Sequence, residues 1–191
     1  MQHLRRGIAY VMDTLETVVF VGSLFMVVYM FIGQPTEVQG ASMEPNFHTG
    51  DRVILSKITY KFRPMERGDV IILRASTNPD LLLIKRLIGL PGDTVLISEG
   101  RVSVNGKQLE ESGYLASATP VWDYGAINED VPFTVPRDYV FVMGDNRPRS
   151  SDSREFGPVP IASILGNAVY RLSPAAVIGG IDNPLPADER R

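Results

Sequence analysis

Cysteine is missing from the chain, and histidine occurs only twice, as His3 and His48. Without cysteine there are no disulfides, no thiolate nucleophile and no cysteine-ligated metal. Two histidines are too few for a typical histidine-rich zinc site, so we expect no bound metal. A basic excess is also missing, because 19 basic and 22 acidic side chains give a formal net charge of −3. Nucleic acid is therefore not an expected partner.

Charge is absent from one long stretch near the start of the chain. None of the residues 17–36 is charged, and the middle reads VVFVGSLFMVVYMFIG. About 20 helical residues rise roughly 30 Å, which matches the hydrocarbon core of a bilayer. We therefore predict a transmembrane anchor over residues 15–36, after a cytoplasmic segment over residues 1–14. Arg5 and Arg6 precede the span and favour a cytoplasmic N-terminus.

A cleaved signal peptide and a soluble core helix fit this apolar run less well. A cleaved signal peptide has a shorter apolar run, and no Ala-x-Ala site follows this one. A core helix of a soluble protein is the second alternative, but this segment is apolar on every face and lies at the start of the chain. An uncleaved anchor places the bulk of the protein outside the cytoplasm.

Beyond Pro35 short apolar runs alternate with Gly, Pro, Asn and Asp. This spacing predicts a mostly β fold, a folded antiparallel sheet or barrel, over residues 37–178. Asn105 and Gly106 lie between two short runs and predict a two-residue hairpin turn, because both turn positions need positive φ. The expected strands are residues 37–41, 52–56, 70–73, 81–88, 94–98, 101–104, 139–143 and 167–172.

Two segments break the strand pattern. Residues 110–136 are punctuated by glycine and proline, and we interpret them as an insertion or flap. Residues 179–191 form a tail that is proline-containing and charged from Asp182 on, and we expect it to be mobile.

The first segment with a chemical signature covers residues 38–45 and reads VQGASMEP. Ser42 follows two small residues directly after a predicted strand, and Pro45 prevents a regular helix. Such a serine lies exposed on a turn that another backbone can approach. An ordinary loop serine has the same local features, so this segment alone does not identify a nucleophile.

The second segment places a lysine inside an apolar strand. Alternate residues of a strand share a face, so Lys85 lies in one row with the leucines at 81, 83 and 87. A lysine can reach water along its stem, but this is harder in mid-strand than at an end. Full burial lowers a lysine pKa from about 10.4 by about 3 to 5 units. A neutral amine beside a serine hydroxyl would form a serine–lysine pair, a variant of the serine–histidine–aspartate arrangement.

The third segment, residues 144–160, is dense in polar and charged side chains and directly follows a predicted strand. A solvated surface loop would have this composition, and so would a cation loop built on Asp145 and Asp152. The acidic spacing does not match an EF-hand. The segment alone leaves these alternatives open.

Together these segments resemble the bacterial type I signal peptidase family. The resemblance covers most of the chain and rests on five features in the family's order and spacing. They are the apolar anchor, Gly-Ala-Ser-Met-Glu-Pro, Arg-Gly-Asp-Val-Ile, Ile-Lys-Arg with Gly-Leu-Pro-Gly-Asp, and Gly-Asp-Asn-Arg-x-x-Ser-x-Asp-Ser-Arg. Each motif alone is weak, whereas the set is specific.

The resemblance implies a serine endopeptidase that needs no cofactor and removes signal peptides from exported pre-proteins after Ala-x-Ala. It implies Ser42 as the nucleophile of an acyl-enzyme mechanism and Lys85 as the general base. Ser150 would orient the lysine amine; Ser151 and Ser153 are its rivals by position, and only the register of the motif in the third segment separates them from Ser150.

The resemblance also assigns supporting roles. The oxyanion hole would use the backbone amide of Ser42 and the backbone of Gly40, where some members of the family carry a serine hydroxyl. Two ion pairs would brace the loop that holds Ser150, namely Arg86 with Asp145 and Asp152 with Arg154. The implied wall of the substrate pocket consists of Val38, Met43, Phe47, Leu83 and Ile84.

The implied partners are pre-protein signal peptides and the lipid bilayer, with the export machinery as a further associate. The implied location is the plasma membrane, with one span and the peptidase domain on the extracytoplasmic side; a thylakoid membrane is the alternative.

Two rival functions remain open at this point. One is a self-cleaving serine–lysine protease of the repressor type, which the predicted anchor disfavours because those proteins are cytoplasmic. The other is a membrane-tethered β-domain that binds extended peptides without cleaving them. A histidine-based hydrolase is excluded, because His3 lies across the predicted membrane from Ser42 and no aspartate is spaced to orient His48.

Overall fold

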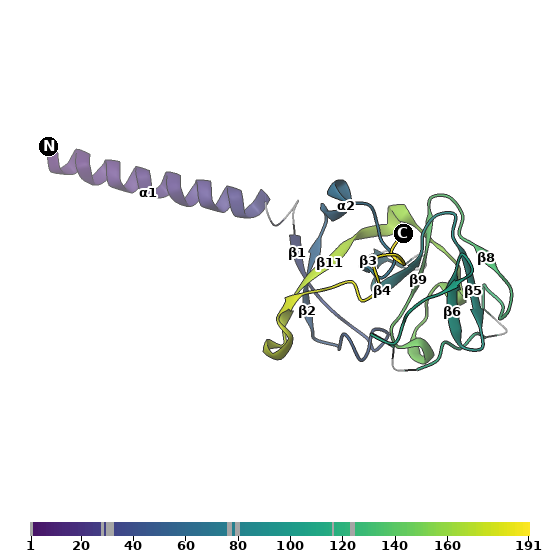
Figure 1. Cartoon of the computed structure of the whole chain (residues 1–191). Helices are drawn as coiled ribbons and strands as arrows, with labels where there is room; N and C mark the ends of the chain where they lie inside the picture. Colours follow the sequence, from purple (N-terminus) through teal and green to yellow (C-terminus); the bar gives the residue numbers. More distant parts are fainter. Residues whose placement is uncertain are drawn as a thin grey trace.

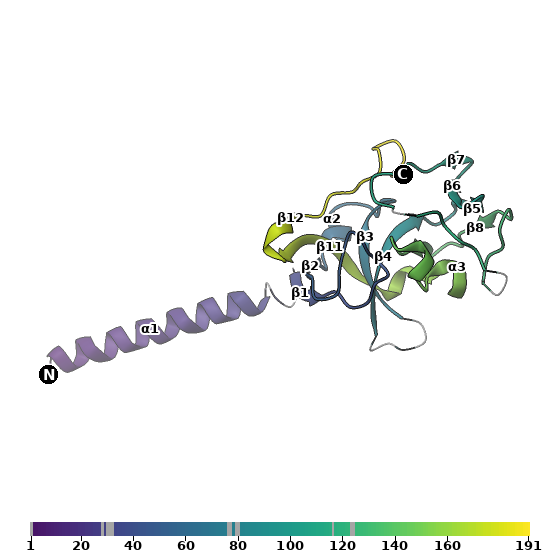
Figure 2. The ribbon, with the colours of Figure 1, turned by 90° about the horizontal axis from the view of Figure 1, so that it is seen from below.

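The computed structural model describes residues 2–27, 29, 33–75, 78, 81–115, 117–122 and 125–191. Over these ranges one long helix extends away from two antiparallel β-sheets that lie side by side (Figures 1 and 2). The predicted class, mostly antiparallel β with one N-terminal apolar helix, is confirmed.

The N-terminal helix α1 comprises Gln2–Val27. In the part of the chain that the structure describes, it is the one helix long and apolar enough to cross a membrane, with a mean hydropathy of 1.5 over Arg5–Val27 and no buried residue. The side chain of His3 and residues 28 and 30–32 of the uncharged run lie outside the described part.

The predicted end of the anchor at residue 36 is wrong. Strand β1, Gly33–Glu37, pairs along its whole length with β2, Arg52–Ser56. Gly33, Gln34 and Thr36 carry no charge but are not strongly apolar, so a lack of charge overstated the length of the span. The strand expected over residues 37–41 is observed as β1, which begins at Gly33 and ends at Glu37.

The large sheet has the order β1-β2-β11-β3-β4-β9-β10, and β12 pairs with β11. All of its pairings are antiparallel. The remaining strands of this sheet are β3 (Val70–Arg74), β4 (Leu82–Gly89), β9 (Tyr139–Met143), β10 (Val159–Pro160), β11 (Ile164–Ser173) and β12 (Gly179–Gly180). Short helices α2 (Thr59–Phe62), η2 (Arg147–Arg149), α3 (Ser153–Phe156), η3 (Ile161–Ser163) and η4 (Ala175–Val177) connect them.

The small sheet has the order β7-β6-β5-β8. Its strands are β5 (Thr94–Ser98), β6 (Arg101–Val104), β7 (Lys107–Gln108) and β8 (Phe133–Thr134). The predicted hairpin turn joins β6 to β7, with φ of 54° at Asn105 and 81° at Gly106. Both values are positive, as a type I′ turn requires.

The apolar core is divided by β4. Ile84 belongs to a cluster that also contains Met43 and Phe47 from the loop after β1. Leu87 points to the opposite face and packs in a second cluster with strands β3 and β9. A third cluster joins the small sheet to the ends of β4 and β9. β4 therefore lies at the centre of the molecule, which explains how a lysine on it becomes buried.

The expected flap at residues 110–136 is packed rather than free. Tyr114, Thr119 and Ile127 are buried, and Ile127 belongs to the cluster that joins the two sheets. Residues 116, 123 and 124 of the insertion lie outside the described part.

The tail was expected to be mobile, and this is wrong for its last residues. Leu185 is only 1% exposed. The Asn183 side chain donates to the Arg67 carbonyl at 2.7 Å, and the Arg67 guanidinium donates to the carbonyls of Glu189, at 2.9 Å, and Arg191. The proline and charge content of the segment predicted a solvated tail, because a local pattern carries no information on a contact with Arg67, which lies 116 residues earlier than Asn183.

Candidate active site

The serine turn lies in the loop that joins β1 to β2. The base of this loop is closed by two backbone hydrogen bonds, from Val38 N–H to the Asp51 carbonyl at 2.8 Å and from Gly50 N–H to the Val38 carbonyl at 2.9 Å. Gly40 has a φ of +86°, a region that favours glycine. Ser42 itself is half-buried, so its hydroxyl lies at the boundary between core and solvent.

Asn146 anchors this turn, and sequence reasoning did not single it out. Its backbone N–H donates to the Ser42 carbonyl at 2.9 Å. Its side-chain amide donates to the Ala41 carbonyl at 3.0 Å. The asparagine inside the Gly-Asp-Asn-Arg motif was the available signal. These two bonds join the serine turn to the polar loop after β9.

Lys85 is buried in the middle of β4, with 2% of its surface exposed. Over the described ranges no hydrogen bond or ion pair engages its ammonium group. Burial is the main cause that lowers its pKa to about 8; Asp152 and Asp145 oppose the shift, and the nearby Arg154 contributes to it. A lysine with this pKa is substantially neutral at mildly alkaline pH, so it can accept a proton.

Ser150 differs from its two rivals. Its hydroxyl is buried and has no hydrogen-bond partner among the described residues. Ser151 is exposed, and the Ser153 hydroxyl accepts a hydrogen bond from Val142 N–H at 3.0 Å. Buried hydroxyls normally have a partner, so the Ser150 hydroxyl is the one of the three available to another group in the site.

Gly144 marks where the serine turn and the Ser150 loop meet. A Cβ atom at this position would lie under 3.0 Å from both the Ser150 hydroxyl and the Ser42 carbonyl. The two serines therefore converge on the bare Cα of Gly144, and the approach depends on the absence of a side chain.

The close contact of the two serine-bearing segments at Gly144 gives a first prediction. Gly144→Ala is expected to lower kcat for peptide cleavage by about 100-fold, because a methyl group must push apart the two serine-bearing segments. Gly113→Ala is the matched control, since its Cβ would meet nothing within 4 Å. Steady-state cleavage assays on both variants decide the matter, and equal kcat values in the two would contradict the prediction.

The expected ion pairs are both present and buried. Arg86 forms a two-pronged pair with Asp145, with N–O distances of 2.7 and 2.6 Å. Arg154 donates to Asp152 at 2.8 and 2.9 Å. The Asp152 carboxylate also accepts the Gly144 N–H at 2.9 Å, which ties this pair to the contact point of the two serines.

The Gly40 backbone was expected to contribute to the oxyanion hole, but its N–H already has a hydrogen-bond partner. It donates to the Thr49 hydroxyl at 3.1 Å, and that hydroxyl donates back to the Gly40 carbonyl at 3.2 Å. The pattern around Ser42 could not reveal this, because Thr49 lies nine residues further along the loop.

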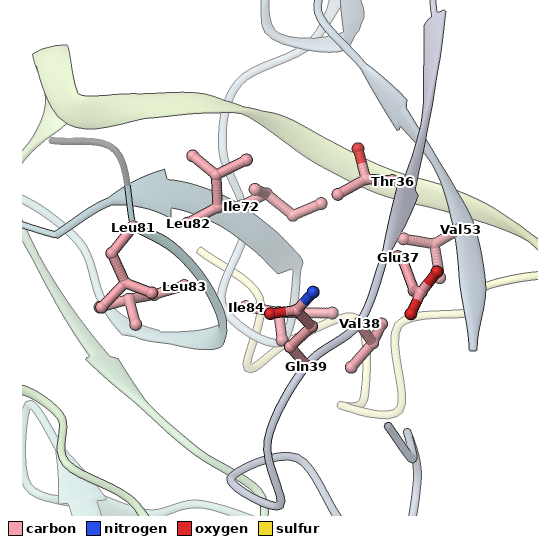
Figure 3. Close-up of a pocket in the computed structure, with 10 residues that line it drawn as sticks. All are labelled: Thr36, Glu37, Val38, Gln39, Val53, Ile72, Leu81, Leu82, Leu83 and Ile84. Carbon is pink, nitrogen blue, oxygen red and sulfur yellow. The ribbon is translucent and has the colours of Figure 1, made fainter. Parts of the chain in front are cut away.

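A cavity of about 210 Å³ lies between the first part of β4 and residues 36–39. Figure 3 shows the side chains of both segments around it. Of the predicted pocket residues, Val38, Leu83 and Ile84 line this cavity, and the remaining lining residues are Thr36, Glu37, Gln39, Val53, Ile72, Leu81 and Leu82. Met43 and Phe47 pack in the same apolar cluster as Val38 and Ile84 but do not line the cavity.

One edge of β4 is open beside this cavity. β3 pairs with residues 82–86 of β4, whereas β9 pairs with the other edge only from Arg86 onward. Residues 82–85 therefore have no neighbour on the β9 side among the described strands. An unpaired strand edge next to an apolar cavity can accept an extended peptide as an added strand.

The chain matches the family model described as "Signal peptidase, peptidase S26" over residues 11–173. It is 41% identical over 155 residues to a probable signal peptidase I-2 of Synechocystis, covering 78% of this chain and 67% of the relative. It is 35% identical to a probable thylakoidal processing peptidase 2 of Arabidopsis thaliana, covering 84% of this chain and 43% of the relative.

A solved structure of a signal peptidase I from Enterococcus faecalis is 37% identical, with a TM-score of 0.45, and the match covers 55% of this chain and 97% of that chain. The family match extends from the N-terminal helix to the end of β11 and includes every segment of the site described above. The chain belongs to the type I signal peptidases of the S26 family and is a serine endopeptidase.

Proposed function

We propose that Ser42 and Lys85 form the catalytic dyad of this signal peptidase, which cleaves pre-proteins after Ala-x-Ala. The observation that carries the proposal is Lys85, a buried lysine that no ion pair holds in its charged form over the described ranges and whose pKa is lowered to about 8. A buried lysine with only a structural role would be expected to have a counter-ion.

The proposed reaction begins when neutral Lys85 removes the proton of the Ser42 hydroxyl. The Ser42 oxygen attacks the scissile carbonyl carbon, and the Ser42 backbone N–H stabilises the oxyanion. The C–N bond then breaks, Lys85 gives its proton to the leaving amine, and an acyl-enzyme remains. Lys85 next activates water, which releases the signal peptide and frees Ser42. Ser150 holds the Lys85 amine toward Ser42 through its hydroxyl, which has no other partner among the described residues.

We further propose that the signal peptide lies extended along the open edge of β4. In this position its backbone can pair with residues 82–85, as in other strand-addition complexes. Its small side chains would enter the cavity lined by Val38, Leu83 and Ile84.

The apolar helix fits a membrane anchor. We propose a single span with a cytoplasmic N-terminus, on the basis of Arg5 and Arg6, and a peptidase domain on the extracytoplasmic side. The plasma membrane is the proposed location and a thylakoid membrane the alternative. The anchor would concentrate the enzyme where signal peptides leave the export machinery.

The test is the pH dependence of cleavage. For a pre-protein with an Ala-x-Ala site, kcat/KM of the detergent-solubilised protein is expected to rise with pH through an apparent pKa of about 8. The sign follows because only the neutral amine can accept the serine proton, so activity is lost as pH falls and Lys85 becomes protonated. The assay runs from pH 6 to 10 on wild type and Ser42→Ala.

Three results would contradict the proposal. Cleavage that rises only near 10.5, the ordinary lysine value, would show that Lys85 is not a perturbed base. Binding of the pre-protein without cleavage by wild type would favour a peptide-binding domain. A single internal cut of the purified chain, with no cleavage of the pre-protein, would favour a self-cleaving protease.

A further inference from the structure

Residues 111–122 contact all three buried arginines of the site. The Arg86 guanidinium lies over the Tyr114 ring at 4.3 Å, and the Arg154 guanidinium lies over the Trp122 ring at 4.7 Å. The third arginine, Arg147, binds the side chain of Glu111. This part of the insertion therefore touches every cation that braces the catalytic loop.

Arg147 is fully enclosed, like Arg154, with 0% of its surface exposed. Its Nη1 and Nη2 atoms both donate to the Glu111 carboxylate, and Nη1 also donates to the Thr119 hydroxyl. Its Nε donates to the Gly144 carbonyl at 3.0 Å. The Tyr114 hydroxyl adds a hydrogen bond to Glu111 at 2.6 Å. Glu111 is thus the carboxylate that neutralises a buried charge and sets its orientation.

The Gly144 peptide is held on both sides by this network. Its N–H donates to Asp152 and its carbonyl accepts from Arg147. The Cα of Gly144 lies against the Ser150 hydroxyl and the Ser42 carbonyl. A displacement of the Gly144 carbonyl would therefore move the two serine-bearing segments relative to Lys85.

We propose that Glu111 is a positioning residue of the peptidase, which fixes the Gly144 peptide through Arg147 and so holds Ser150 and Ser42 in register with Lys85. The inference rests on the proposed Ser42–Lys85 chemistry. It assigns the insertion a role in catalysis although none of its described residues hydrogen-bonds to the side chain of Ser42 or Lys85.

The charges that face Lys85 are those of Asp145, Asp152 and Arg154. Glu111 is not among them, so its removal acts on Lys85 through the packing of the loop. When that packing loosens, water gains access to the Lys85 amine, and the desolvation that depresses its pKa is reduced. The apparent pKa of activity then moves upward from about 8 toward the ordinary value of 10.5.

The first variant is Glu111→Gln, with Glu110→Gln as its matched control. Glu110 is exposed and its side chain bonds only to Ser112 among the described residues. For Glu111→Gln we expect kcat to fall by about 100-fold, KM to stay within about twofold, and the pH step to move to higher pH. Glu110→Gln is expected to match wild type in all three. A Glu111→Gln variant with a wild-type kcat and pH step would overturn the inference.

A double variant separates positioning from plain stabilisation. Replacing both charges, as Glu111→Leu with Arg147→Met, avoids a lone buried charge and is expected to restore Tm relative to Glu111→Gln. In the double variant the Gly144 carbonyl has lost its Arg147 donor, so kcat is expected to remain low. Recovery of kcat together with Tm would show that Glu111 is purely structural. If wild type itself shows no pH step near 8, the proposed dyad fails rather than the role of Glu111.

Discussion

Lys85→Met is expected to lower kcat/KM for pre-protein cleavage by at least about 10³-fold while the protein stays folded. Methionine matches the lysine stem in length, and over the described ranges no ion pair is broken by the change. Lys61→Met is the control, because Lys61 is exposed. Cleavage by Lys85→Met at the wild-type rate would remove Lys85 from the mechanism.

The same variant makes a prediction about stability. The pKa of Lys85 is lower in the folded protein, about 8, than its ordinary value of 10.5. The unfolded chain therefore binds more protons between these values, and wild-type stability rises with pH across that window. At neutral pH the folded protein bears a cost of roughly 3 kcal/mol, at 1.36 kcal/mol per pKa unit, that Lys85→Met lacks. Thermal unfolding in detergent at pH 7 and pH 10.5 should show the variant more stable at pH 7 and the difference closing at the higher pH.

Arg154→Met is expected to cause the largest loss of stability. Arg154 and Asp152 are both fully buried, and the arginine also donates to the carbonyls of Pro120, Arg147 and Ser150. Removal of the cation leaves the Asp152 charge without its ion-pair partner, which typically costs about 3–5 kcal/mol. For a chain of this size each kcal/mol lowers Tm by roughly 2–4 °C, so the expected fall is about 10 °C.

The control for this prediction is an exposed pair. Lys107 and Asp188 are in contact, with side chains 56% and 70% exposed. Solvent screens such a pair, so Asp188→Asn, which leaves the contact of Lys107 with Glu189 in place, is expected to leave Tm unchanged. Calorimetry on both variants distinguishes the cases. Similar Tm values for Arg154→Met and wild type would mean that the buried pair does not hold the catalytic loop in place.

The local features of the fold follow from the sequence. Strand alternation placed Lys85 in a leucine row on a central strand, and the Asn105-Gly106 turn has the positive φ values that its residues favour. Motif order predicted the family. These inferences succeed because period, turn chemistry and motif spacing depend on residues close together in the chain.

Other features depended on tertiary contacts. In the sequence only motif register separates Ser150 from Ser151 and Ser153, whereas the fold leaves the Ser150 hydroxyl buried without a described partner. The Gly40 amide is engaged by Thr49, and Met43 and Phe47 pack in the apolar core without lining the cavity. In each case the deciding contact is made by a neighbour outside the motif.

The sequence by itself determined the class of the fold, the family and the identity of the nucleophile and base that we propose. The tertiary structure decided which of the three serine hydroxyls is buried without a described partner and how the insertion and the tail pack. Glu111 reaches Arg147 across 36 residues of chain, and Asn183 reaches Arg67 across 116. Residue patterns report local backbone preference and burial, whereas a contact at that separation depends on how the two sheets fold against each other.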